Sequence, residues 1–410
     1  MTRKNICLVT NWYPSKDNPD RGQFFREQAL ILKEHYDFII VHLYERIGKK
    51  NIRRDFANKI KHEENIDEYE VTIQISLIAY LLDRAYKLLR IANKKDITEG
   101  AGRFASKWGD KYIRKKIINC FKAGIENRID IFYCVDAQNE ASLIKLLADE
   151  YQKPYIVGEH GIVPWPGSVV SKNNKEAIEK ADAFLAISND KIRQMMLLGI
   201  KLPPVFYIGN LIDETKFAVH RENSEKKTFI IIAAYSYIKN YDMFISVFNK
   251  LSDSAVKPFK VLIVGYAANK GYSTNMEELE KKIRESKFKE MVEMIPSIPH
   301  EEIGSVLNRA DAFVMTSIQE GQPVSAMEAA CCGLPIFSTR CGGVEDYVDD
   351  QIGRVYSIID SDSMAEGLNS FLNGEIRFDS EYIRRKVIEL FGIESFSHNF
   401  SKAVEFVSER

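Results

Sequence analysis

The chain has 410 residues and a formal net charge of −1, with 45% hydrophobic and 28% charged residues. This length exceeds what one hydrophobic core usually fills, so two domains are expected, and the balanced charge argues against nucleic acid as a partner of the whole chain. No apolar run approaches the roughly 18 residues of a membrane-spanning helix, and the start lacks the apolar region of a signal peptide. We therefore expect a cytoplasmic protein.

The first predicted elements form a β-loop-α-β unit. The sequence predicts a buried strand at residues 6–9, a turn-rich loop at 11–22, a helix with Phe25, Ala29 and Leu32 on one side, and a second strand at 38–42. This order is typical of a Rossmann-like sheet. Since no G-x-G-x-x-G motif was found, a dinucleotide oxidoreductase is not expected.

Residues 45–128 are the least regular part of the chain, with alternation typical of a strand at residues 69–75. A block within it, residues 81–128, holds 13 Lys or Arg against 5 Asp or Glu. With Phe104, Trp108 and Tyr112 at helical spacing, this block could dock peripherally on an anionic membrane. It could equally be a solvated helical face whose aromatic residues belong to the core.

Regular α/β alternation returns after this block. Strands are predicted at residues 131–135, 155–160 and 183–187, which complete a first domain over residues 1–204. Residues 203–210 read as the crossing between domains. A second domain over residues 205–385 has predicted strands at 229–233, 260–265, 292–295, 312–315, 335–338 and 353–356. The fold class is therefore α/β with two Rossmann-like domains.

Two glutamates eight residues apart, Glu320 and Glu328, lie across the start of a short predicted helix. Pro323 suits the first helical position and Gly333 suits the helix end. The free N–H groups near Val324, Ser325 and Ala326 can receive phosphate oxygens. At about 1.5 Å per residue, Glu328 lies about 7–8 Å along the helix axis from Pro323. Glu328 falls about 40° from Val324 around the helix, on its buried side. The pattern indicates a site for a sugar diphosphate.

Residues 317–343 resemble the signature of retaining glycosyltransferases of family 4, in the glycosyl transferases group 1, with the GT-B fold. The resemblance implies two Rossmann-like domains facing across a cleft and a last helix, residues 386–410, that packs back on the first domain. It also implies that Glu320 contacts the donor sugar, that Glu328 binds the ribose, and that sugar and phosphate are held by Gln322, Pro323, Val324 and Ser325.

Lys239 is the predicted cation for the departing diphosphate, because it follows the second domain's first strand as the phosphate-binding lysine of the resembling family does. Ala234 stands where that family often has arginine, and Asn240 replaces a glycine. Either Lys239 therefore acts without the arginine, or another cation such as Arg340 or Lys191 contributes.

Other candidates follow from the same resemblance. Gly22 would let the first domain approach the diphosphate, although it could be a plain turn glycine. His160 lies at the carboxyl end of a strand and would face the donor sugar, although it could be a structural strand cap. Asn210 would organise a turn with a secondary donor contact, and the nucleotide base would rest near Gly265 and Ile298. His300 is a weak candidate near that base pocket.

No metal site is expected. The six cysteines show no C-x-x-C pair or His/Cys zinc spacing, so reduced thiols are predicted. Residues 360–362 form a D-x-D motif, which chelates a metal in glycosyltransferases of a different fold. Because it directly precedes a predicted helix, capping by Asp or Ser explains it better.

Taken together, the residues and the resemblance predict a metal-independent retaining hexosyltransferase without a cofactor. It would move a sugar from a nucleotide sugar to a glycan or lipid-linked glycan in bacterial cell-surface polysaccharide assembly, in the cytoplasm or at the inner face of the plasma membrane. The alternatives are a sugar-nucleotide epimerase or a phosphorylase of the same fold, and a non-catalytic subunit that binds sugar nucleotides. The sequence names neither the sugar nor the acceptor.

Overall fold

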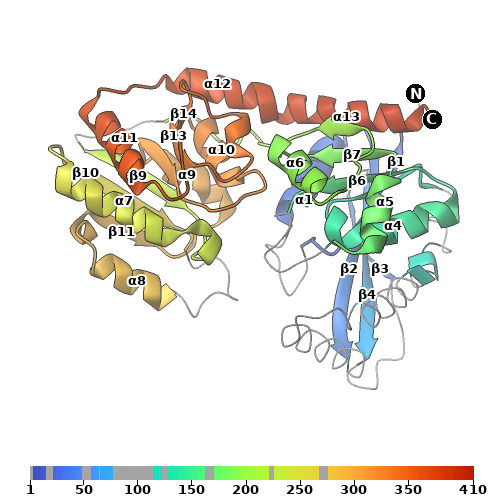
Figure 1. Ribbon diagram of the computed structural model, residues 1–410. Helices are drawn as coiled ribbons and strands as arrows, with labels where there is room; N and C mark the ends of the chain where they lie inside the picture. Colours follow the sequence, from blue (N-terminus) through green and yellow to red (C-terminus); the bar gives the residue numbers. More distant parts are fainter. Residues whose placement is uncertain are drawn as a thin grey trace. The chain divides into compact units, whose positions relative to one another are not determined.

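The structure, a computed structural model, describes residues 3–14, 22–48, 57–63, 65–76, 114–115, 117–119, 121, 128–161, 170–220, 226–266 and 276–410. The chain forms two compact units (Figure 1). The first unit comprises Met1–Ala186, Met195–Phe206 and Phe400–Arg410, and the second comprises Ile187–Gln194 and Tyr207–Asn399. The chain thus passes between the units at residues 186/187, 194/195, 206/207 and 399/400.

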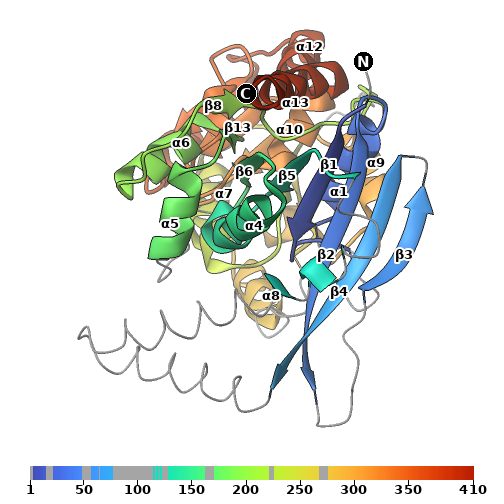
Figure 2. The same cartoon turned by 90° about the vertical axis from the view of Figure 1, so that its right-hand side faces the viewer.

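The sheet of the first unit has the strand order β3-β4-β2-β1-β5-β6-β7-β8. β3 runs antiparallel to β4 at the outer edge of this sheet, whereas β1, β2, β4, β5, β6 and β7 pair in parallel (Figure 2). The strands are β1 (Asn5–Thr10), β2 (Asp37–Gly48), β3 (Ala57–Glu63), β4 (Ile66–Ser76), β5 (Ile131–Cys134), β6 (Tyr155–Glu159), β7 (Ala183–Ala186) and β8 (Val205–Tyr207).

Helices cover both faces of this sheet. Successive residues of β5 point to opposite faces. The ring of Phe132 lies 6.0 Å from that of Tyr151 in α4, whereas the ring of Tyr133 lies 5.8 Å from that of Phe400 in α13. The helices are α1 (Gln23–Leu32), α4 (Ala137–Tyr151), α5 (Lys172–Glu179), α6 (Asn189–Leu197), which begins in the second unit, and α13 (Ile393–Ser408), which ends in the first.

The sheet of the second unit is parallel throughout its pairings, with the order β11-β10-β9-β12-β13-β14. Successive strands are added on one side of β9 and then on the other, so the order reverses between β9 and β12. This is the doubly wound arrangement of a Rossmann-like sheet. The strands are β9 (Lys227–Ile232), β10 (Phe259–Val264), β11 (Val292–Ile295), β12 (Ala312–Met315), β13 (Ile336–Thr339) and β14 (Gly353–Tyr356).

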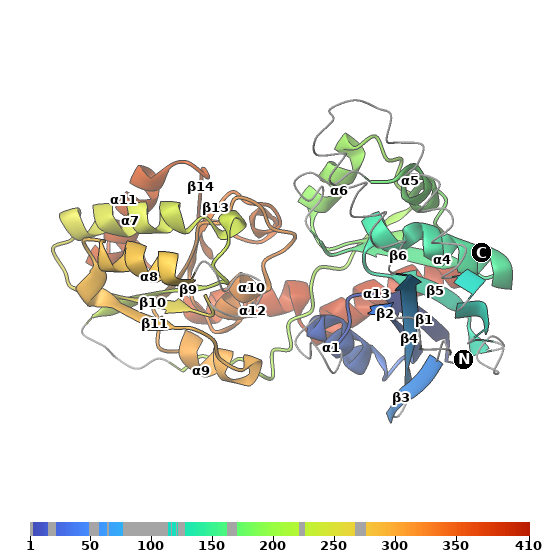
Figure 3. The same ribbon diagram turned by 90° about the horizontal axis from the view of Figure 1, so that it is seen from below.

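Two apolar cores lie on the two faces of the second sheet. Phe229 of β9 belongs to the core under α7 (Tyr241–Ser254), α8 (Met276–Arg284) and α11 (Ser361–Asn373). The next residue, Ile230, belongs to the core under α9 (Ile303–Leu307), α10 (Val324–Cys331) and α12 (Ser380–Phe391). Figure 3 shows the two helical layers. Short 3-10 helices complete the unit: η3 (Tyr237–Lys239), η5 (Lys289–Met291), η6 (His300–Glu302) and η7 (Val344–Asp346).

The predicted α/β class with two Rossmann-like sheets is confirmed. Each predicted strand is present within one or two residues, except that β2 and β4 are longer than expected. β3 and β8 were not predicted. The basic block at residues 81–128 lies largely outside the described residues. Within the part of the chain that is described, no helix has the length and apolar character needed to cross a bilayer.

Candidate functional site

The candidate site of the second unit lies at the carboxyl ends of β9 and β12. Open α/β sheets bind ligands where the strand order reverses, because the loops of the neighbouring strands diverge there. Lys239 lies in the loop after β9, and Glu320 lies in the loop after β12. Since β9 and β12 are paired neighbours, these loops leave the sheet side by side.

The structure pairs these two residues. Nζ of Lys239 lies 2.6 Å from Oε1 of Glu320, and the two side chains are 29% and 10% exposed. Backbone contacts hold the loops together, since Ile318 N–H donates to the carbonyl of Ile238 at 2.7 Å. The sequence predicted both residues for the site but not their pairing, which joins segments 81 residues apart. A cation and a carboxylate therefore lie within reach of one small ligand.

The start of α10 differs by one residue from the prediction. Pro323 is the N-cap and not the first helical residue, because its ψ of 104° is extended. Its carbonyl accepts from the N–H groups of Ala326 and Met327, both at 3.2 Å. The prediction that the Ala326 N–H is free for phosphate is therefore wrong. The amides of Val324 and Ser325, which precede these bonds, are the first-turn donors that an anion would use.

The end of α10 forms as predicted. Gly333 has a φ of +73°, its N–H donates to Ala330 O at 2.8 Å, and the next N–H, of Leu334, donates to Ala329 O at 3.0 Å. This pair of bonds is a Schellman motif, which favours glycine. A β-carbon at Gly333 would lie 2.8 Å from the carbonyl oxygen of Ser380 in α12. The helix is thus kept short at both ends.

Glu328 points into the second unit, as its place near Val324 on the helix predicts. Its side chain is 5% exposed, and Oε1 lies 2.7 Å from Nε2 of His300. A carboxylate oxygen accepts this bond when Nε2 of His300 carries the ring proton. His300 begins η6, 28 residues earlier in the chain. Neither Glu320 nor Glu328 turns outward into solvent.

Gln322 is fixed from the segment after β8. Its Oε1 accepts from the N–H of Asn210 at 2.5 Å, and its carbonyl accepts from the Asn210 side-chain amide at 3.0 Å. Its own amide donates to the hydroxyl of Tyr207 at 3.2 Å. Asn210 therefore organises the backbone next to the helix start.

Gly265 and Ile298 lie at the same edge of the second sheet. Gly265 follows β10 with a φ of +74°, and its N–H donates to Ile295 of β11 at 2.9 Å. Ile298 is half-buried against the core under α9 and α10. The contact of both residues with a nucleotide base remains a prediction.

Gly22 and His160 belong to the first unit. Gly22 caps α1 with a φ of +67°, and a β-carbon there would lie 2.4 Å from the carbonyl oxygen of Trp12. This close approach accounts for the glycine structurally. His160 follows β6, and its ring meets that of Phe25 edge-on at 4.9 Å. Their predicted contacts with a donor remain predictions.

One residue that sequence reasoning did not single out is Glu140, in the first turn of α4. Its carboxyl group accepts from Thr10 Oγ1 at 3.0 Å and from the N–H of Asn11 at 2.8 Å, at the carboxyl end of β1. Burial and nearby Asp136 raise the pKa of Glu140 to about 8. No local pattern reveals this acid, because Thr10 and Asn11 lie 130 and 129 residues earlier in the chain.

The D-x-D caps a helix, and a role of the alternative cations, Arg340 and Lys191, at the diphosphate remains a prediction. Arg340 is exposed. Lys191 is fully buried, and its Nζ donates to Gln194 Oε1 at 3.1 Å. Asp360 caps α11 by accepting from the N–H of Ser363 at 3.0 Å, as predicted. The five cysteines of the described ranges are free and buried, and these ranges contain no cluster of three His, Cys, Asp or Glu residues suited to a metal ion.

Similar proteins were found by sequence. Residues 212–387 match the family Glycosyl transferases group 1. A phosphatidylinositol N-acetylglucosaminyltransferase subunit from Arabidopsis thaliana is 25% identical over 232 residues, which are 56% of this chain and 49% of that protein. Lipopolysaccharide 1,6-galactosyltransferase from Salmonella typhimurium is 24% identical over 293 residues, 68% of this chain and 75% of that protein. The chain thus spans about half the length of the Arabidopsis relative.

A solved structure supports the same fold. Anabaena Alr3699/HepE in complex with UDP aligns with a TM-score of 0.69, over 98% of this chain and 99% of that chain, at 13% identity. At this identity the likeness shows the fold, which is the predicted GT-B fold. The signature predicted at residues 317–343 lies inside the segment 212–387 that matches the family Glycosyl transferases group 1.

Proposed function

We propose that this protein is a retaining glycosyltransferase that moves a hexosyl group from a nucleoside-diphosphate sugar to a hydroxyl of a glycan or lipid-linked glycan. The observation that carries the proposal is the pair of buried carboxylates, Glu320 and Glu328, on either side of the α10 start. Relatives named as galactosyl- and N-acetylglucosaminyltransferases support it. We place it in bacterial cell-surface polysaccharide assembly, in the cytoplasm or at the inner membrane face.

In the proposed donor complex each group has one role. The amides of Val324 and Ser325 receive phosphate oxygens at the positive end of the α10 dipole. The Lys239 ammonium neutralises the charge that develops on the departing diphosphate, so no metal is needed. Glu328 accepts from the ribose hydroxyls, and Glu320 binds the donor sugar. The first unit receives the acceptor.

The proposal predicts two separable defects. The protein is incubated with a panel of nucleotide sugars, and thermal stabilisation, nucleoside diphosphate release and product mass are measured. Glu328→Ala should weaken nucleoside diphosphate affinity at least tenfold, because the ribose contact is lost.

Lys239→Ala should lower turnover about 10²-fold, as expected when one preorganised charge is removed from a leaving group. Release should continue in EDTA.

A matched control is Glu366→Ala, because Glu366 is an exposed acid on α11. Normal nucleotide affinity in Glu328→Ala would contradict the assignment. Release that requires an acceptor glycan supports a transferase. An isomeric nucleotide sugar without acceptor would indicate an epimerase, a requirement for inorganic phosphate would indicate a phosphorylase, and binding without release would indicate a non-catalytic subunit.

A further inference from the structure

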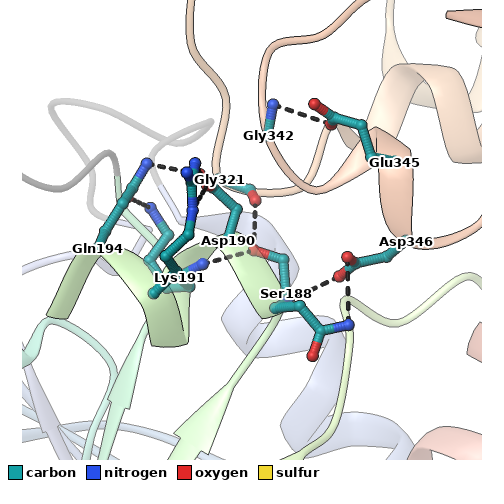
Figure 4. A network of polar contacts seen from close by, with 10 residues as sticks. Ser188, Asp190, Lys191, Gln194, Gly321, Gly342, Glu345 and Asp346 are labelled. Carbon is teal, nitrogen blue, oxygen red and sulfur yellow. Dashed lines mark hydrogen bonds and ion pairs between the residues drawn. The ribbon is translucent and has the colours of Figure 1, made fainter. Parts of the chain in front are cut away.

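Four residues connect the segment after β7 and the end of β8, which we call the crossing segments, to the loop that carries Glu320. We call them the clamp: Ser188, Asn189, Tyr207 and Asp346. Ser188 and Asn189 follow β7 of the first unit by two and three residues, but they belong to the second unit, as Tyr207 and Asp346 do. Figure 4 shows the hydroxyl of Ser188 pointing to Gly321. The clamp therefore starts where the chain crosses between units.

Ser188 bonds to the backbone next to Glu320. Its hydroxyl donates to the carbonyl of Gly321 at 3.0 Å and accepts from the N–H of Lys191 at 3.2 Å, so it also caps α6. The residue is fully buried. Water does not reach this hydroxyl. Without the hydroxyl, the Gly321 carbonyl would have no hydrogen-bond donor, because solvent could not supply one. Ser188 thus fixes the peptide that follows Glu320.

Asp346 gathers the remaining contacts. Its carboxylate accepts from the N–H of Asn189 at 2.8 Å and from the Asn189 side-chain amide at 3.2 Å. It also accepts from the hydroxyl of Tyr207 at 3.2 Å, and that hydroxyl in turn accepts from the amide of Gln322. One carboxylate therefore connects both crossing segments to the loop before α10.

The segment that leads to Asp346 contains two tightly packed glycines. Gly342 and Gly343 have φ values of +94° and +70° and immediately precede η7, which ends at Asp346. A β-carbon at Gly343 would lie 2.4 Å from the carbonyl oxygen of Gly321. The N–H of Glu320 donates to the carbonyl of Cys341 at 2.7 Å. The Glu320 loop therefore lies directly on the segment that leads to Asp346.

We propose that Ser188 and Asp346 are positioning residues: through Gly321 and Gln322 they hold the Glu320 loop in the geometry that sugar transfer requires. This inference rests on the proposed function. A misplacement of about 1 Å can cost roughly 10²-fold in rate, even when the mutated residue touches no substrate. The proposed nucleotide contacts, on the α10 amides and Glu328, do not include the clamp. Turnover should therefore depend on the clamp far more than nucleotide affinity does.

The test compares Ser188→Ala, Asp346→Ala and Asp346→Asn with Asp350→Ala. Asp350 is a suitable control because it lies four residues beyond Asp346 with a side chain that is 94% exposed. Affinity is measured by calorimetry with whichever of UDP, ADP and GDP binds the wild type best. Turnover is measured as release of that diphosphate from its most stabilising nucleotide sugar. The clamp variants should lose at least tenfold in turnover and less than threefold in affinity, and the control should match the wild type.

Two results would overturn the inference. Turnover within twofold of wild type in all three clamp variants would show that the loop does not need the clamp. A loss of affinity, melting temperature and turnover in parallel, in the mild Asp346→Asn variant as well, would show a merely structural role. Failure of the proposed function looks different, because then the wild type itself would release no diphosphate from any nucleotide sugar, and the clamp inference would fall with it.

Discussion

Glu140 is a buried acid whose pKa makes the first unit sensitive to pH. Burial and the charge of Asp136 outweigh the hydrogen bonds from Thr10 and Asn11, so the pKa of Glu140 rises from an ordinary value of 4.5 to about 8. The folded state therefore binds this proton more tightly than the unfolded state does. Stability from this group is fully present below pH 4.5 and is lost as the pH rises through 8.

Replacing the acid tests this expectation. The melting temperature of the wild type should fall between pH 5 and pH 9, by the equivalent of a few kcal/mol, because folding then has to ionise a buried carboxyl group. Glu140→Gln should show a flatter profile and should gain relative to the wild type at pH 9. Parallel profiles for the two proteins would rule out Glu140 as the source.

The burial and backbone conformation of single residues were predictable where local pattern sets them. Glu320, Glu328 and Gly333 lie in one short segment, so helix geometry alone predicted a buried glutamate and a glycine end. The pairing of Glu328 with His300 was not predictable, because it depends on the packing of η6 against α10. Ser188 and Asp346 were missed for the same reason: their partners lie 133 and 157 residues away.

At the scale of elements, the turn between η3 and α7 depends on Asn240. This residue has a φ of 49° and a ψ of 55°, and its side chain accepts from the N–H of Met243 at 3.3 Å as the N-cap of α7. Asparagine is among the few residues that tolerate the left-handed conformation. Asn240 therefore adopts, next to Lys239, a conformation that glycine would also allow.

Two substitutions at Asn240 should differ in cost. Asn240→Gly keeps the left-handed conformation and should cost a few tenths of a kcal/mol. Asn240→Ala loses the cap and strains the backbone, which together cost about 2 kcal/mol, or roughly 4–8 °C in the melting temperature of a unit this size. Thermal unfolding of both variants measures the difference. Equal costs would contradict the conformational part of this explanation.

Most elements followed from sequence because parallel buried strands are nearly continuous apolar runs, as at residues 6–9 or 229–232. β3 lacks such a run. It pairs antiparallel at the outer edge of its sheet, with a register shift between Lys59 and Lys61, and an edge strand needs no apolar pattern on both faces. β8 has only three residues, too few for any periodicity.

At the scale of the whole molecule, each compact unit has its own sheet and core, and Phe400–Arg410 completes the first. Phe400 is 2% exposed, and its ring lies 5.9 Å from that of Tyr36, whose hydroxyl donates to Ser401 at 2.8 Å. We expect two calorimetric transitions, because multi-domain proteins seldom unfold in one step.

Phe400→Ala should lower the free energy of unfolding of the first unit by about 3–5 kcal/mol, because a buried aromatic side chain is removed from one core. Only the melting temperature of that unit should therefore fall. The nucleoside diphosphate that binds best should raise only the other transition. His398→Ala is the control, since His398 is exposed two residues earlier in the same helix. If both transitions fell together in Phe400→Ala, the two units would not unfold separately.

The return of Phe400–Arg410 to the first unit also affects how the protein is made. A ribosome synthesises the strands of that unit early but delivers its last helical segment only after the entire second unit has emerged. The nascent first unit must therefore wait with the apolar surface around Tyr36 and Tyr133 uncovered, while the second can already fold. During translation, the first unit thus begins to form before the second unit and is completed after it.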